Sequence, residues 1–408
     1  MPAEDYDSWA AAGNDEWSHQ RLLPFFCMNE TDLDYGDKPC HGDAGPIRAR
    51  RFKEAEINPE HRAFYAAALD AGYADCPDHN EPDSTGVGPL ALNNAEGIRW
   101  STAIGYLNPA RSRPNLTIEA NAHVCRVLFE GKRATGLQIE QNGTFSEVHG
   151  GEILLCGGSI GSPHMLLLSG VGPATHLEAM GVPIVCDLPG VGQNLRDHPQ
   201  TGVTLRAIEQ YLTDGTEPRL QIGLRYTAAG SPLRNDMLIF PASFATEAGY
   251  YASSHSKPLG FYLIGCLYLA TSAGDLTLAS TNPHQQPVLN YNYFDDPFDA
   301  KRLRESIRIM IELLEHEGLK ELVAECLAPT DAQLATDATL DEWIRTNVGT
   351  SHHVSSTCKM GQSPTRWPPS ISTARSTASK ICALPTRRSC PTACVPTPTS
   401  PRWSSASA

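Results

Sequence analysis

The sequence predicts an α/β protein (α+β overall) in which an α/β unit is followed by a largely antiparallel sheet. The first observation is a short apolar run at 153–156, a glycine pair, and a helical apolar pattern that begins at Ser162-Pro163 and ends at Gly170. The second is a series of short β-patterned runs over 201–297, separated by loops rich in glycine, serine and proline. The third is length, because 408 residues, 41% of them hydrophobic, can bury a large core and fill two domains.

The strand, glycine turn and helix start of the first observation form a candidate cofactor site. Gly157 and Gly158 lie between the expected strand and the expected helix. Backbone N–H groups at the start of a helix have no partner within the helix, and the helix dipole favours negative charge there. The segment therefore predicts a place where an anionic cofactor meets the backbone.

The composition excludes several classes of function. A net charge of −14, from 32 basic and 46 acidic residues, argues against binding to nucleic acid or to an anionic membrane. No apolar run is long enough to span a bilayer, and the N-terminal segment does not have the pattern of a signal peptide. The twelve cysteines lack the spacing of a metal site or of a disulfide framework. We therefore expect a cytoplasmic enzyme with no metal, no nucleic-acid partner and no membrane span.

Three other segments have clear secondary-structure patterns. Residues 115–155 have β-branched runs joined at Asn142-Gly143, a dipeptide suited to a tight hairpin turn. The strand-like runs between 201 and 297 are VTLRAI, LQIGLRY, DMLIFPA and GFYLIGCLYLA. Residues 299–322 have apolar side chains at helical spacing, which predicts a surface-packed helix.

Several separate blocks resemble the glucose-methanol-choline (GMC) family of flavin oxidoreductases. They are EILLCGGSIGSPHMLLLSG and PGVGQNLRDHP within 152–200, the start DYDSWAAAGNDEW, the segment 86–116, and GDLTLASTNPHQQPVLNYNYFDDPFD. The resemblance, which is to choline dehydrogenase-like members, implies an FAD-dependent oxidoreductase that converts the CH–OH group of an alcohol to an aldehyde or ketone. It implies an incomplete Rossmann-like FAD-binding domain over 1–200, a substrate-binding domain over 201–297, and a helix and return to the FAD domain over 298–361.

The resemblance also implies where FAD would bind. Val124 would offer its backbone to the adenine, although a core strand position would suit its side chain equally well, and Cys156, Gly157 and Gly158 would line the site. The family's first strand, G-x-G-x-x-G turn and helix, which hold the pyrophosphate, have no counterpart near this N-terminus. The nearest substitute, at 190–192, is a turn without a following helix. We expect a chain that is truncated at its start relative to the family and that holds FAD weakly.

His353 is the candidate catalytic base. In TSHHVSSTCKMG it stands where the family has His-x-x-Gly-Thr before a Met-Gly pair. A neutral imidazole suits removal of the hydroxyl proton while hydride leaves the adjacent carbon for flavin N5, because its pKa lies near working pH. His352 is the weaker candidate. Ser356 replaces the glycine of the motif, where a side chain either crowds the turn or is tolerated if its φ is negative.

Two other interpretations stay open. Residues 157–161 satisfy G-x-S-x-G, the nucleophile elbow of an α/β-hydrolase, with Ser159 as nucleophile and His353 downstream in the chain order that this fold requires. No oxyanion motif of the HGGG type accompanies it, and it explains one block whereas the GMC resemblance explains several. The third interpretation is an inactive remnant of the GMC family. The electron acceptor, oxygen or a quinone-like carrier, is left open.

The composition changes abruptly after Gly361. Residues 362–408 are poor in large aliphatic side chains and rich in serine, threonine, proline and arginine, which predicts a disordered tail. Each residue of the tail can be written as one of its degenerate codons, and the bases can then be read in a frame that starts at the third base of each codon. In that shifted frame, codons compatible with the sequence from Arg375 onward spell VHGIENLRVADASIMPD, a string that resembles the GMC ending. We therefore expect a frameshift between Gly361 and Arg366.

Overall fold

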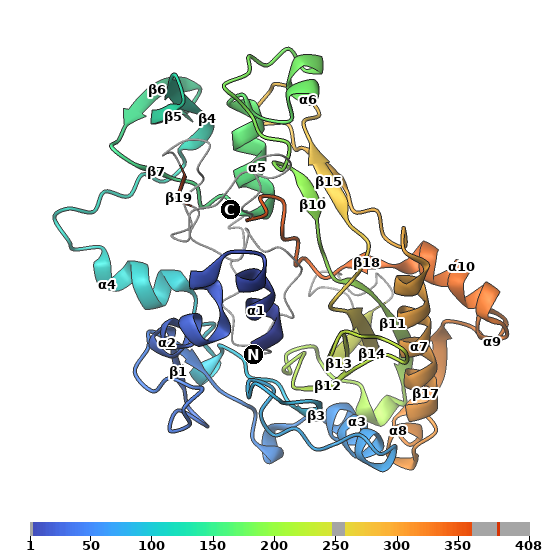
Figure 1. The fold of residues 1–408 in the computed structure, drawn as a ribbon. Coiled ribbons are helices and arrows are strands. Elements are labelled where there is room, and N and C mark those ends of the chain that lie inside the picture. The colour runs from blue at the N-terminus through green and yellow to red at the C-terminus, as the bar shows by residue number, and fades with distance from the viewer. Residues whose placement is uncertain (1–2, 247–257, 361–381, 384–408) are drawn as a thin grey trace.

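A seven-stranded antiparallel sheet forms the larger part of the structure, a computed structural model that describes residues 3–246, 258–360 and 382–383 (Figure 1). Its strands run in the order β17, β11, β14, β13, β12, β3, and the short β18 also pairs with β11. The sheet confirms the predicted antiparallel arrangement. It extends beyond the predicted range 201–297, because β3 pairs with β12, and β17 and β18 pair with β11. The bounds are β3 Gly86–Pro89, β11 Pro199–Ala207, β12 Ile222–Tyr226, β13 Met237–Thr246, β14 Pro258–Leu267, β17 Val323–Ala328 and β18 Gly349–Thr350.

Helices cover one face of this sheet. α3 (Pro59–Asp70) and α7 (Pro297–Leu313) pack against its central strands, and α8 (Glu317–Lys320) lies beside α3. The predicted helix over 299–322 is therefore two helices, because His316 is extended and its ring accepts the Gly318 N–H at 3.2 Å, which starts α8. The core between helices and sheet includes Phe64, Ala68, Leu205, Leu224, Ile239, Leu263, Leu303, Ile307 and Met310.

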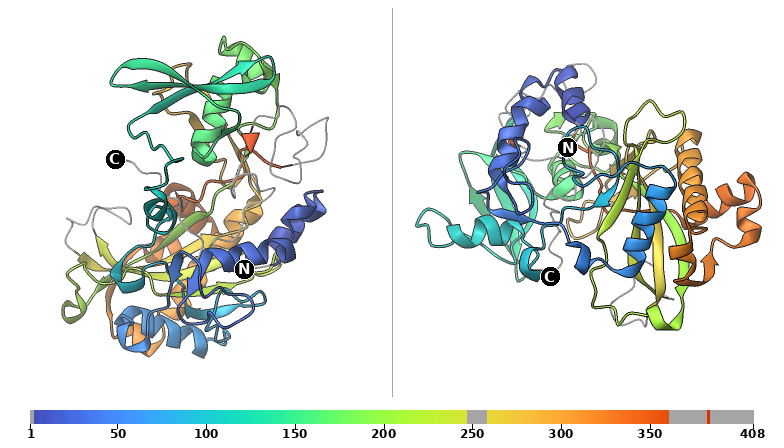
Figure 2. Two further views of the ribbon diagram at one scale, coloured as in Figure 1. Left: turned by 90° about the vertical axis from the view of Figure 1, so that its left-hand side faces the viewer. Right: turned by 90° about the horizontal axis from the view of Figure 1, so that it is seen from below.

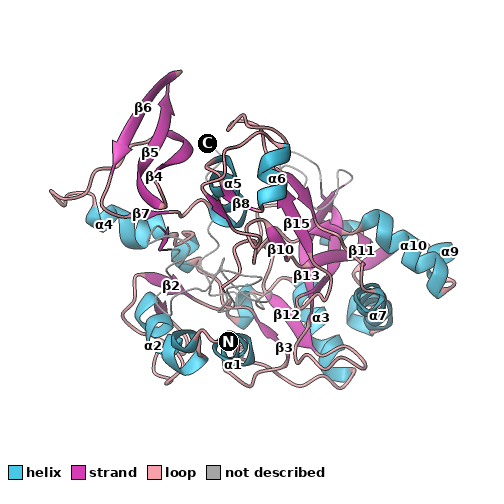
Figure 3. Ribbon diagram, turned by 45° about the horizontal axis from the view of Figure 1, so that its top comes forward, coloured by secondary structure: helices cyan, strands magenta, loops and turns pink. Residues whose placement is uncertain are grey.

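The predicted hairpin and glycine-turn helix form a smaller part, which lies at the opposite end of the molecule from the large sheet in the left view of Figure 2. The hairpin contains β4 (His123–Glu130), β5 (Arg133–Gln141) and β6 (Thr144–His149), and α5 (Gly158–Leu168) packs against β4 (Figure 3). The predicted turn at Asn142-Gly143 is confirmed: the two residues have φ of 50° and 75°, the left-handed values that a two-residue hairpin turn requires.

Helix α5 begins at Gly158 rather than at Ser162-Pro163. Pro163 lies inside the helix and has no N–H, so the carbonyl of Ser159 loses its helical donor. The hydroxyl of Thr357 donates to this carbonyl at 2.6 Å. A side chain from a distant segment thus replaces the missing helical bond. Because the local sequence does not reveal this bond, the predicted start of the helix was too late.

Of the predicted tail 362–408, the structure describes only Cys382–Ala383. These residues form β19, which pairs in parallel with β7 (Ile153–Leu154). The rest of the tail lies outside the described residues, so the predicted disorder and frameshift stay predictions. The domain division also stays a prediction, although its boundary at residue 200 falls within β11.

Short elements complete the described chain. None of the helices among the described residues is long and apolar enough to cross a membrane. The remaining α-helices and strands are α1 Ala3–Ala11, α2 His19–Asn29, α4 Asn108–Ala110, α6 Ala174–Ala179, α9 Asp331–Leu334, α10 Asp337–Asn347, β1 Glu30–Asp32, β2 Ile47–Ala49, β8 Val171–Gly172, β9 Cys186–Asp187, β10 Gln193–Leu195, β15 Gly274–Thr277 and β16 Val288–Asn290. The other helical turns are η1 Asp15–Trp17, η2 Glu54–Glu56, η3 Ala95–Gly97, η4 Ala103–Leu107 and η5 Glu209–Tyr211.

Candidate active site around His353

The loop that carries His353 is anchored to the segment in front of β11. Ser355 and Arg196 exchange two backbone hydrogen bonds, at 2.7 and 3.0 Å. The Ser351 hydroxyl donates to the carbonyl of His198 at 2.7 Å, and β18 pairs with the start of β11. These bonds fix the position of His353 relative to the large sheet.

His353 is half-buried and lies against Asp197 and His198. Its backbone N–H donates to Oδ1 of Asp197 at 3.0 Å. The rings of His353 and His198 meet edge to face with their centroids 5.2 Å apart, and the Tyr268 ring lies 4.7 Å from that of His198. His352, by contrast, is exposed and has a left-handed backbone with φ of 58°. The hydrogen bond with Asp197 and the contact with the His198 ring therefore hold His353 in a defined position.

The sequence interpretation missed Asp197 and His198 as site residues. Both are buried, and Asp197 also accepts a hydrogen bond from the hydroxyl of Tyr293. Burial raises the pKa of Tyr293, and the charge of Asp197 raises it further, so this hydroxyl stays a donor. The only sequence signal was the PGVGQNLRDHP string, which carried the family resemblance but no role for single residues.

Two hydrogen bonds join the His353 loop to the start of α5. The Ser159 hydroxyl donates to the carbonyl of Val354 at 2.5 Å, and the Thr357 hydroxyl donates to the carbonyl of Ser159. Ser159 lies in the first turn of α5, next to the glycine pair. The loop of the predicted base therefore lies directly beside the predicted cofactor turn.

The four predicted cofactor residues lie in β4 and at the start of α5. Val124 is half-buried in β4, where it pairs with Ile139. Cys156 is exposed, Gly157 is the residue that precedes α5, and Gly158 begins the helix with φ of 97°. Because α5 packs against β4, the strand of Val124 lies beside the helix that the glycine pair begins.

Ser356 has the backbone conformation for which the family's glycine is suited. Its φ is 68° and its side chain is fully buried. The tolerance expected from a negative φ is therefore wrong for this position. Left-handed backbone costs a residue with a Cβ about 1–2 kcal/mol.

Replacing Ser356 with glycine is expected to raise the free energy of unfolding by about 1 kcal/mol, because it removes the Cβ from a left-handed position. Ser356→Ala is the matched control, since it removes the hydroxyl but keeps the Cβ. Urea unfolding measures both variants. An equal gain from alanine would show that the backbone explanation is wrong.

The geometry at Ser159 does not support the hydrolase alternative. The nucleophile of an elbow has an exposed hydroxyl that donates to a histidine ring. Ser159 is buried, and its hydroxyl donates to a backbone carbonyl oxygen.

A separate buried network of charged side chains surrounds His41. Its Nδ1 lies 2.9 Å from Glu30 and 3.1 Å from Asp32, and its Nε2 lies 2.9 Å from Asp78. Arg51 pairs with Asp32 at 2.9 Å and with Asp78 at 2.6 Å. Burial opposes a charge on His41, but the hydrogen bonds with the three carboxylates outweigh it and raise its pKa to about 12.

The His41 network has the spacing of metal ligands but the chemistry of an ion-pair network. Single ligand atoms of Glu30, Asp32 and His41 lie within 4.8 Å of one another. Both ring nitrogens of His41 face carboxylates, so the imidazole is doubly protonated and offers no lone pair to a metal. We interpret the cluster as a structural feature.

Comparisons with known proteins agree with the fold and with the family resemblance of the sequence. The GMC oxidoreductase family matches in two parts, its N-terminal domain over residues 1–200 and its C-terminal domain over residues 270–371. The chain belongs to the GMC oxidoreductase family.

Curated relatives match over most of the chain. The oxygen-dependent choline dehydrogenase 1 of Chromohalobacter salexigens is 35% identical over 382 residues, and the mitochondrial choline dehydrogenase of Mus musculus is 33% identical over 385 residues. Each match covers 88% of this chain, and it covers 68% and 63% of the respective relative. The chain thus spans about two thirds of the length of these relatives.

Solved structures share the fold. Pyridoxine 4-oxidase from Mesorbium loti superposes with a TM-score of 0.85 at 24% identity, covering 98% of this chain and 78% of the other. A formate oxidase variant from Aspergillus oryzae, studied for FAD modification, gives a TM-score of 0.87 at 19% identity with the same coverage.

Proposed function

We propose that this protein is an FAD-dependent oxidoreductase that oxidises the CH–OH group of an alcohol, with His353 as the base. The observation that supports this most strongly is the pair of hydrogen bonds that joins the His353 loop to the first turn of α5. A base beside a cofactor turn is the arrangement that alcohol oxidation requires, because proton and hydride leave neighbouring atoms of the substrate.

The residues at the start of α5 fit a polar cofactor group. Gly157 precedes the helix and has no side chain to cap it, so the residue at this position leaves the first N–H groups of α5 uncapped. The hydroxyl of Ser162 is buried and has no hydrogen-bond partner among the described residues. Gly157, Gly158 and the backbone of Val124 would hold FAD, which supplies the hydride acceptor when it is bound.

The protein residues would move the proton and orient the substrate. The imidazole of His353 removes the proton from the substrate hydroxyl oxygen as the carbon–hydrogen bond breaks. Asp197 holds the backbone of His353 through the N–H bond, and the His198 ring packs against the edge of the His353 ring. Both neighbours restrict the orientation of the base.

The class of alcohol and the location of the enzyme are part of the proposal. Several curated relatives are named choline dehydrogenases, so choline is the first substrate to test, with benzyl alcohol as an uncharged comparison. The enzyme is proposed to be cytoplasmic, and the net charge of −14 argues against a nucleic-acid partner. Aldehyde formation in the presence of added FAD tests the activity, and its absence with every alcohol would contradict it.

Replacing Gly158 with alanine is expected to weaken FAD binding about tenfold, because φ of 97° at the helix start is strained for a residue with a Cβ. Gly181→Ala is the control, since Gly181 also has positive φ (68°) but lies in open space after α6. Titration of the protein with FAD, followed by flavin fluorescence, measures both. If both variants weaken FAD binding equally, the start of α5 is not part of the FAD site.

A further inference from the structure

A pocket of about 250 Å³ lies at the far end of β11 from His353. Pro199, the first residue of β11, follows His198, whereas Ala207, the last residue, lines the pocket. A strand of this length separates its two ends by roughly 25 Å. The pocket is therefore distinct from the candidate active site.

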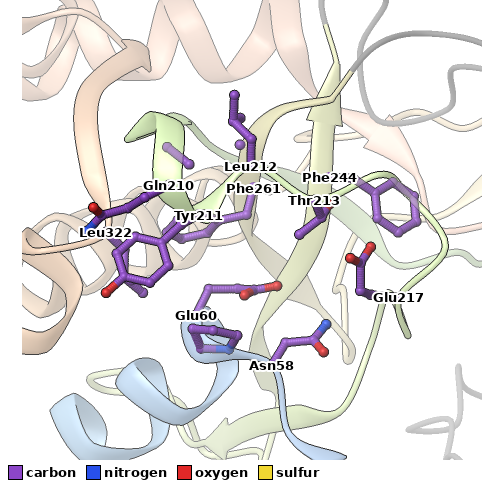
Figure 4. Close-up of a pocket in the computed structure, with 13 residues that line it drawn as sticks. Asn58, Glu60, Gln210, Tyr211, Leu212, Thr213, Glu217, Phe244, Phe261 and Leu322 are labelled. Atoms are coloured by element: carbon purple, nitrogen blue, oxygen red, sulfur yellow. The ribbon is translucent and has the colours of Figure 1, made fainter.

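Two carboxylates and several rings line this pocket (Figure 4). Glu60 and Asn58 come from the start of α3, and Glu217 comes from the loop between η5 and β12. Aromatic and aliphatic side chains complete the wall: Tyr211, Leu212, Phe244, Phe261 and Leu322. The lining thus combines hydrogen-bond acceptors with apolar surface.

The carboxyl group of Glu60 is held in place by the protein. Glu60 is only 7% exposed, and the hydroxyl of Ser243 donates to its Oε1. The Asn58 amide donates in turn to the Ser243 oxygen at 3.0 Å. His61 also lies 3.3 Å from this oxygen, but burial lowers the pKa of His61 to about 3, so its ring is neutral and adds no positive charge.

The two carboxylates have no cationic partner among the residues that the structure describes. Neither Glu60 nor Glu217 forms an ion pair there, and Oε2 of Glu217 is buried without a hydrogen-bond donor. Burial raises the pKa of Glu60, and the neighbouring charge of Glu217 adds to the effect. A cation between the two groups would offset the cost of burying the charge of Glu60 and the repulsion between the two carboxylates.

We propose that this pocket binds a small primary ammonium ion with an alkyl or aryl tail. A primary ammonium supplies three N–H donors, which suit the carboxylates of Glu60 and Glu217, and charge-assisted hydrogen bonds of this kind are stronger than neutral ones. The rings of Tyr211 and Phe261 provide apolar contact for the tail and a negative π-face for the charge, whereas the Arg219 guanidinium already lies over the Phe244 ring, 5.1 Å from its centroid. The site does not depend on FAD or on the proposed oxidation.

Calorimetric titration of the 408-residue protein with butylammonium chloride tests this proposal. We expect saturable binding of butylammonium and none of 1-butanol, which has the same tail without the charge. Glu217→Gln, in a half-exposed loop, is expected to weaken binding about tenfold or more, because it removes one charged acceptor. Glu60→Gln should do the same with little change in shape.

Glu209→Gln is the matched control, since Glu209 lies in the neighbouring η5 but does not line the pocket. It removes the same charge and is expected to leave binding unchanged. The proposal is overturned if butylammonium does not bind, if 1-butanol binds equally well, or if Glu209→Gln weakens binding as much as Glu217→Gln. Circular dichroism of each variant establishes that the fold is retained.

Discussion

Replacing His41 with leucine is expected to lower the free energy of unfolding by about 3–5 kcal/mol. The change removes the cation that Glu30, Asp32 and Asp78 share, and it leaves buried carboxylates with too little positive charge. Arg51 remains, but its guanidinium already pairs with Asp32 and Asp78. Removal of one partner from a buried ion pair is costly because the other partner stays buried.

The control for His41 is an exposed histidine with a carboxylate neighbour. His149 lies 3.4 Å from Glu147, and the side chains are 63% and 52% exposed. Since water screens exposed pairs, His149→Leu is expected to change the free energy of unfolding by less than about 1 kcal/mol. Chemical unfolding compares the two variants, and similar small effects would contradict the role of the buried network.

The same network predicts how stability depends on pH. The pKa of His41 is raised to about 12, so its contribution is fully present below the unfolded value of about 6.5 and is lost as pH rises toward 12. Burial opposes the charged form of Asp78, but the His41 hydrogen bond and the Arg51 charge lower its pKa to about 2. Its contribution is therefore present above about pH 4 and lost as pH falls toward 2. The network should stabilise the fold most between about pH 4 and 6.5.

Replacing His353 with alanine is expected to lower the rate of flavin reduction by alcohol about 10²–10⁴-fold in the FAD-loaded protein. Substrate binding should change much less, because the lost interaction is the removal of a proton in the transition state. His352→Ala is the control: this neighbour is exposed, and its removal should have little effect. Greater damage from His352→Ala would show that the base is misassigned.

Features with a local cause could be predicted from the sequence. The turn at Asn142-Gly143 needs two residues with positive φ, and both residue types tolerate it. The antiparallel sheet followed from β-patterned runs, and the family followed from several separate blocks. His353 itself was found because it matches the family motif, not because of its local pattern.

Features that depend on distant segments could not be predicted. The start of α5 depends on Thr357, which replaces the donor that Pro163 lacks. The positions of Asp197 and His198 beside His353 follow from the pairing of the His353 loop with the residues before β11. The ion pairs of His41 join three separate segments, so no spacing in the sequence indicates them.

Anaerobic rapid mixing of the FAD-loaded protein with an alcohol tests the central claim most directly. If the enzyme transfers hydride from the carbon that bears the hydroxyl group, the visible flavin absorption bleaches in a single turnover. Deuterium on that carbon then slows the bleaching, and His353→Ala slows it further. If no alcohol reduces the bound flavin, or if His353→Ala reduces it as fast as the unmodified protein, the proposed function and the role of His353 are contradicted.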